Sequence, residues 1–196
     1  KLAIHVGEII INQESIIDLA RNHLGESDAN FFAFIKQTFD EETSLLYDGV
    51  RLPPEWAKYD SLPEDFLDIK ESDKLKKAYH SSEIVSVKLP ITLHPKNRAK
   101  IDSFITVFLK SDKTITNTTE AFIRTDLVIS GEKRITNLPG TAYALIVADH
   151  HEIAAFLADS EIANHTKFNY QMLAVNSNYN KVEETLAVAP YPTNSG

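Results

Sequence analysis

The chain has 196 residues, of which 20 are basic and 28 acidic, so its net charge is −8 with neutral histidines. Hydrophobic residues make up 43% and charged residues 24%. Globular domains average about 45–50% and 25%, so a disordered tail, a collagen-like chain and a coiled-coil rod are excluded. The absence of cysteine excludes disulfides, thiolate nucleophiles, zinc ribbons and iron–sulfur clusters. This length predicts one or two domains.

Charge is unevenly distributed along the chain. Residues 1–80 carry nine basic and sixteen acidic side chains, whereas residues 88–134 carry nine basic and five acidic ones. This shift indicates two regions with different partners, or acidic helices that simply face water. No apolar run approaches the roughly 18 residues of a membrane span, and the first residues lack both an initiator Met and a signal-peptide pattern. We therefore expect a cytoplasmic fragment of a larger protein, without membrane contact.

The first 80 residues are expected to be mostly helical. Apolar spacing predicts a helix over Asn12–Leu24, with Asn12 as its cap and Gly25 in the left-handed position past its end. A second helix is predicted from its cap Ser27 to Phe39. Its inward side chains are expected to be Phe31, Phe32, Ile35 and Phe39. The proline-broken stretch 51–69 predicts an irregular connection held by aromatic side chains, before a short charged helix over 71–80.

The pattern changes from helical to alternating at Glu83. Apolar residues at every second position predict a half-buried strand over Val85–Leu93, in which Pro90 favours an edge position. A hairpin loop at 95–100 leads to a second strand, Ile101–Lys110, covered on both faces. A third strand is predicted over Ala121–Ile129, with a turn at 130–133.

The apolar run Ala142–Ala148 predicts a central strand. It leads into a helix for which Asp149 and Glu152 have the spacing of a capping box. The predicted fold class is α+β: a helical N-terminal region followed by a mostly antiparallel sheet of about four strands with a packed C-terminal helix. The expected division is a helical region at 1–80, a sheet domain at 81–170 and an irregular tail at 171–196.

Metal-capable side chains are densest around the predicted C-terminal helix. They are Asp149, His150, His151, Glu152, Glu161 and His165. Glu161 and His165, four residues apart, are able to share a helix face, but the two neighbouring histidines lie a helix length away, so three ligands do not converge. We expect a Glu–His pair that fixes the helix exit, no metal site and no catalytic residue. No phosphate-binding loop or nucleophile elbow occurs either.

Basic residues gather in two predicted loops. If the first three strands of the sheet form a meander, loops 95–100 and 131–134 lie at the same end and form a basic rim. This rim consists of Lys96, Arg98, Lys100, Lys133 and Arg134. Cations on loops bind phosphates of a nucleotide or of a nucleic-acid backbone, although solvated turns have the same composition. Arg124, within the third strand, is expected to form an ion pair or to project into a site.

A short motif carries a family resemblance. The strand around Arg124, the apolar run 142–148 and the segment with Glu161, His165 and Thr166 resemble a region of large bacterial proteins that carry a GHKL-type ATPase domain. This superfamily includes gyrase, heat-shock chaperones, histidine kinases and mismatch-repair proteins. The family pattern has an aromatic–aromatic–Arg–x–Gly–Met–x–Ile strand and a later Glu–x–Pro–Ala–His–Thr–x–Trp segment. This chain departs from it at Asp126-Leu127, Ala163, Asn164 and Phe168.

The resemblance covers about half of the chain, from Glu83 to Ala189. It implies a non-catalytic transducer domain that follows the ATPase domain, relays the nucleotide state and contacts phosphates. The GHKL nucleotide motifs are missing from this sequence, so ATP and Mg²⁺ are implied only for an upstream domain. The rest of the same polypeptide is the implied partner. Two alternatives stay open: a nucleic-acid or protein-partner binding module, and a stand-alone enzyme with a site around Asp149–Glu152 and His165.

Overall fold

The computed structural model describes residues 4–6, 9–12, 14–40, 45–48, 69–129 and 140–188. The fold is α+β, with a helical N-terminal region and a six-stranded mixed sheet. Its elements in chain order are β1 (Ile4–Val6), β2 (Ile9–Ile11), α1 (Ile16–His23), α2 (Glu26–Phe39), β3 (Leu45–Asp48), α3 (Ile69–His80), β4 (Val85–Leu93), β5 (Ile101–Ser111), β6 (Thr119–Arg124), β7 (Leu127–Val128), β8 (Ala142–Ala148), α4 (His151–Ser160), α5 (Leu173–Asn178) and α6 (Val182–Val188).

The two predicted N-terminal helices are present with shifted starts. The Asn12 side chain accepts hydrogen bonds from the backbone N–H groups of Glu14 and Ser15, at 2.8 and 3.0 Å. It therefore caps the turn before α1, and the helix itself begins only at Ile16. Gly25 has a φ of +119°, a conformation open to glycine because it lacks a Cβ, and α2 follows at once.

The inward face of α2 differs from the prediction at two aromatic residues, Phe34 and Phe39. Phe39 was expected to face inward but is 57% exposed, whereas Phe34 is buried. Phe34 stacks near Tyr143 of β8, with ring centroids 5.9 Å apart. The N-cap of α2 is Gly25 and the helix begins at Glu26, two residues earlier than a cap at Ser27 would place it. The face that meets the sheet is therefore centred on Phe34 and Thr38.

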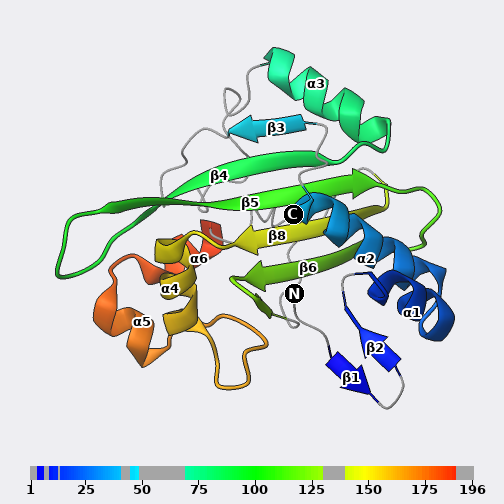
Figure 1. Cartoon of the computed structure of the whole chain (residues 1–196). Helices are drawn as coiled ribbons and strands as arrows, with labels where there is room; N and C mark the ends of the chain where they lie inside the picture. Colours follow the sequence, from blue (N-terminus) through cyan, green and yellow to red (C-terminus); the bar gives the residue numbers. More distant parts are fainter. Residues whose placement is uncertain are drawn as a thin grey trace.

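The sheet has the order β3-β4-β5-β8-β6-β7, which Figure 1 shows from β3 near the top to β6 below. β4 and β5 form the predicted antiparallel hairpin. β8 pairs antiparallel with β5 and parallel with β6, so the predicted meander of the first three strands is wrong. All seven residues of β8 are buried, as predicted for a central strand.

The predicted third strand is two strands joined by a tight turn. β6 ends at Arg124, and β7 returns antiparallel, with Arg124 opposite Leu127. The turn residue Thr125 has a φ of +54° and its N–H donates to the carbonyl of Ala148. The expected turn at 130–133 lies outside the described residues, as do the connection at 51–68 and the chain end at 191–196.

Pro90 lies in a part of β4 that, among the described residues, pairs with a strand on one side only, which suits a residue without a backbone N–H. It lies opposite Phe104 of β5. On the other side of β4, β3 pairs only with Val85–Lys88. Within the described residues, the half of β4 around Pro90 therefore has one strand neighbour, which agrees with the prediction.

Helices cover both faces of the sheet. One face packs against α4, α5 and α6 in a core that includes Ile146, Phe156 and Val175. The other face packs against α2 through Phe34, Tyr143 and Leu145. The helix α3 covers the start of β4 through Leu75 and Tyr79. The expectation of an irregular tail is wrong for 171–188, because α5 and α6 lie there and contribute to the core.

Candidate functional site

The residues that carry the family resemblance meet at one end of α4. Arg124 is the last residue of β6, and Glu161 follows the last residue of α4. The Arg124 Nε donates to Glu161 Oε1, and Nη2 donates to Oε2 at 3.1 Å. The Glu161 side chain is only 2% exposed. The predicted ion pairing of Arg124 is confirmed, with Glu161 as its partner.

His165 completes this cluster from a turn. Its Nδ1 lies 2.6 Å from Glu161 Oε2. An ionised carboxylate only accepts hydrogen bonds, so the donor in this contact is the Nδ1–H group. The second ring nitrogen, Nε2, is not part of the contact with Glu161. The imidazole is 59% exposed. We call Arg124, Glu161 and His165 the arginine–glutamate–histidine network.

The prediction that Glu161 and His165 share a helix face is wrong in its geometry. The helix ends at Ser160, and Glu161 has an extended backbone with φ −70° and ψ 143°. A turn follows in which the His165 N–H donates to the Ile162 carbonyl at 2.9 Å, and His165 has a φ of +53°. The pair nevertheless fixes the helix exit, as expected. Thr166, the fourth motif residue, donates to Asn164 at 2.8 Å.

An aromatic contact lies next to the network. Phe122 of β6 and Phe168 meet edge to face, with ring centroids 5.1 Å apart. Phe168 also forms a backbone bridge with Glu161. The network and this contact together join the exit of α4 to the end of β6. Chemically, the network is a nearly buried carboxylate that accepts hydrogen bonds from three nitrogens on two side chains, with one imidazole edge presented to solvent.

The predicted basic rim does not form as expected. Its premise fails because β8 lies between β5 and β6, and Lys133 and Arg134 lie outside the described residues. Lys96 donates to the backbone carbonyl of Asn176, and Arg98 pairs with Glu152 of α4 at 2.9 Å. Lys100 is exposed. Two of the rim cations therefore hold the hairpin loop against the C-terminal helices.

The histidines at the start of α4 have different settings. His150 Nδ1 lies 2.7 Å from Ser103 Oγ, and its ring contacts Phe104. His151 is 88% exposed. The predicted capping by Asp149 is wrong: the N-cap residue is His150, and its side chain makes no capping hydrogen bond. Across the described part of the chain, no group of three or more His, Cys, Asp or Glu side chains is placed to hold a metal ion.

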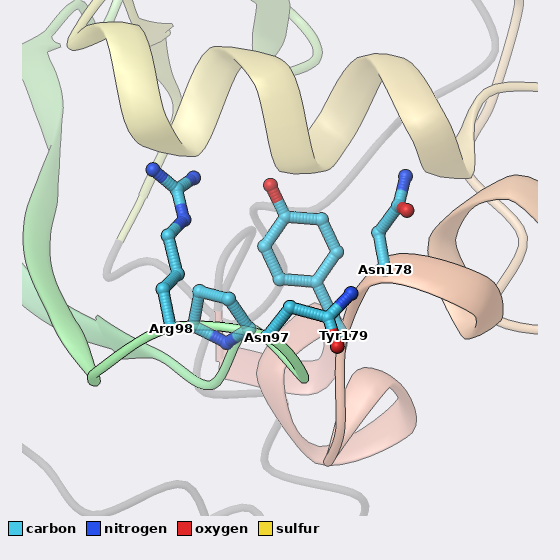
Figure 2. Close-up of a pocket in the computed structure, with 5 residues that line it drawn as sticks. Asn97, Arg98, Asn178 and Tyr179 are labelled. Atoms are coloured by element: carbon cyan, nitrogen blue, oxygen red, sulfur yellow. The ribbon is translucent and has the colours of Figure 1, made fainter.

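A pocket that the sequence did not reveal lies between the hairpin loop and the end of α5. Its volume is about 270 Å³, and it is lined by Pro95, Asn97, Arg98, Asn178 and Tyr179. Figure 2 shows the polar ends of Arg98, Tyr179 and Asn178 pointing toward α4. The asparagines that line it, Asn97 and Asn178, come from segments far apart in the chain, and nothing in the sequence predicts that those segments meet.

The hydroxyl of Tyr179 lies in this pocket and accepts a hydrogen bond from Arg98. Burial raises its pKa above the usual 10.0, the Asp159 carboxylate adds to this rise, and Arg98 opposes it. The ring packs edge to face on Phe156, at 5.0 Å between centroids. Tyr179 therefore contributes both to the core and to the pocket wall.

Comparison with known proteins gives no relative: no family model, curated protein or solved structure matches the chain. None of the helices in the described part of the chain combines the length and the apolar character that a membrane crossing needs.

Proposed function

We propose that the chain is a non-catalytic interaction domain of a GHKL-type ATP-binding protein, which relays the nucleotide state to the rest of the polypeptide. The observation that carries this proposal is the convergence of three residues of the resemblance motif. Arg124 and Glu161 are 37 residues apart in sequence and share one network with His165. These contacts make the motif residues one structural unit of this chain, which supports the proposal.

The element that suits a relay is α4, because an arginine–glutamate pair holds each of its ends. Arg98 of the hairpin loop pairs with Glu152 in its first turn, and Arg124 of β6 pairs with Glu161 just past its last turn. One pair is half-exposed and the other nearly buried. A rigid helix held by two ion pairs of unequal strength is able to release one end while the other stays attached.

The chemistry of ATP hydrolysis belongs to another domain in this proposal. The sequence has no phosphate-binding loop of a known kind and lacks the GHKL nucleotide motifs. ATP and Mg²⁺ are therefore expected to bind upstream. Calorimetry on the isolated chain should show no ATP binding tighter than about 10 μM, roughly −7 kcal/mol; tighter binding would contradict the proposal.

The decisive experiment uses the complete natural polypeptide. Its reading frame should encode a GHKL-type domain before Lys1, and the purified protein should hydrolyse ATP. Glu161→Gln should alter the turnover while the KM for ATP stays unchanged, because Glu161 acts on the relay and not on the nucleotide. The matched control is Asp126→Asn, an exposed acid close to Arg124 in sequence, which should leave both constants unchanged.

Two results would reject this proposal. One is a complete reading frame without a GHKL domain. The other is equal effects of Glu161→Gln and Asp126→Asn on turnover. A salt-dependent shift of DNA by the isolated chain would support the alternative, a nucleic-acid binding module, because release of counterions from phosphates makes such binding weaken with salt.

A further inference from the structure

The pocket beside Arg98 has walls held in place by backbone bonds. The Lys96 N–H donates to the Asn178 carbonyl at 2.9 Å, and the Asn180 N–H donates to the His94 carbonyl at 2.8 Å. These two bonds form an antiparallel bridge between Pro95 and Tyr179. The hairpin loop and the segment after α5 therefore face each other across a fixed gap, and a ligand entering the pocket does not have to organise its walls.

The polar groups that line the pocket are mainly donors. Arg98 has five N–H donors in a planar fork. Its Nη2 donates to Glu152, the guanidinium also hydrogen-bonds the Tyr179 hydroxyl, and the other N–H groups are left for a ligand. Asn178 Nδ2 donates to Asp159 at 2.7 Å, and an amide nitrogen has a second hydrogen. The Tyr179 hydroxyl is protonated at neutral pH, since burial raises its pKa. No carboxylate is among the five lining residues.

We propose that this pocket binds a small oxyanion, a phosphate or carboxylate group, on Arg98 with the side-chain amides of Asn97 and Asn178 beside it. A guanidinium fork matches two oxygens of such a group. Lys96 and Lys100 belong to the same loop and add positive potential to it. The volume of about 270 Å³ suits a single anionic group on a small molecule, and Tyr179 is too buried to stack with a nucleobase.

The Glu152 carboxylate competes with this oxyanion for the Arg98 guanidinium. It already occupies one edge of the guanidinium at 2.9 Å. A bound anion adds a second negative charge beside Glu152, so the anion binds more weakly than it would to a free arginine. Removing the charge of Glu152 should therefore strengthen anion binding, whereas a merely structural pair would show no such effect.

The experiment titrates the uniformly ¹⁵N-labelled chain with inorganic phosphate and, separately, with acetate, and follows the side-chain amide signals of Asn97 and Asn178. Saturable shifts are expected with a Kd on the order of 1 mM for at least one anion. Arg98→Ala and Arg98→Lys should each weaken binding by about tenfold or more, the second because it keeps the charge but loses the fork. Glu152→Gln should strengthen it about threefold.

The matched control is Lys113→Ala, which removes one exposed positive charge from the loop after β5, at the other end of the sheet from the pocket. It should leave the Kd unchanged. Stronger binding of phosphate would assign a phosphoryl ligand, and stronger binding of acetate a carboxylate. The proposal is overturned if neither anion gives saturable shifts, if Lys113→Ala weakens binding as much as Arg98→Lys, or if Glu152→Gln weakens it. These outcomes do not depend on the relay function proposed above.

Discussion

Glu161 is the residue on which the arginine–glutamate–histidine network depends. Its carboxylate is almost fully removed from water, and a buried ion without partners costs several kcal/mol. Arg124 supplies two donors and His165 supplies one. The two partners differ in exposure, at 17% for Arg124 and 59% for His165. Arg124 is therefore the main compensating charge, and His165 is the partner that solvent reaches.

Replacement of His165 tests the weaker half of the network. His165→Asn should lower the free energy of unfolding by about 1 kcal/mol, the loss of one hydrogen bond to a carboxylate that keeps Arg124. Asparagine is chosen because it tolerates the positive φ at this position. Chemical denaturation measures the change. His151→Asn, at an 88% exposed position, should stay within about 0.5 kcal/mol; equal losses for both variants would contradict the assigned role.

The sequence predicted some contacts of the arginine–glutamate–histidine network and not others. The four-residue spacing of Glu161 and His165 indicated a pair, and the pair exists. The turn that joins them was not predicted, because spacing alone does not show that the helix ends at Ser160. An ion pair was predicted for Arg124, but the resemblance alone grouped it with Glu161, since no local pattern connects residues 37 apart.

At the scale of elements, α4 has an apolar face and an arginine–glutamate ion pair at each of its ends. Ile153, Phe156 and Leu157 are buried against the sheet. Their spacing of three and four residues places them on one side of a helix, which is why the sequence predicted the helix and its packing. Burial holds the body of α4, and the arginine–glutamate pairs hold its ends.

Truncation of the α4 face should be the most costly change in this element. Phe156 is 1% exposed and meets Tyr179 edge to face. Phe156→Ala should lower the free energy of unfolding by about 3–5 kcal/mol, through lost burial and the cavity left behind. Leu173→Ala, at an 81% exposed position, should change it by less than about 0.5 kcal/mol. A loss below about 1 kcal/mol for Phe156→Ala would show that α4 does not pack as described.

The positions of the strands in the sequence were easier to predict than the order in which they pair in the sheet. Alternation located β4 and β5, and a continuous apolar run located β8. The predicted third strand includes Thr125 and Asp126, yet the positive φ of Thr125 places these two residues in a turn. The insertion of β8 between β5 and β6 depends on pairing between distant segments, which periodicity does not encode.

At the scale of the whole molecule, three tyrosines make stability sensitive to alkaline pH. Burial raises the pKa of Tyr79, Tyr143 and Tyr179 above the usual 10.0. The folded chain therefore holds these protons more tightly than the unfolded chain. Their contribution to stability is complete below pH 10 and is lost as the pH rises from 10 through the raised pKa values.

The free energy of unfolding should fall as the pH rises above about 10, the ordinary tyrosine value. Tyr179→Phe should make this fall less steep, because it removes one of the three groups. Tyr170→Phe, at a 43% exposed position, should leave the slope unchanged. Urea denaturation between neutral and alkaline pH measures it, and a slope that Tyr179→Phe does not alter would contradict the burial of that hydroxyl.

The central claim is that Arg124 and Glu161 form one energetic unit that joins β6 to the exit of α4. A double-mutant cycle with Arg124→Met and Glu161→Met measures it directly by chemical denaturation. We expect a coupling free energy of about 2 kcal/mol. The corresponding cycle at the half-exposed pair Arg98–Glu152 should give about 1 kcal/mol or less. Additive effects of Arg124→Met and Glu161→Met, within about 0.3 kcal/mol, would contradict the network and the relay proposed from it.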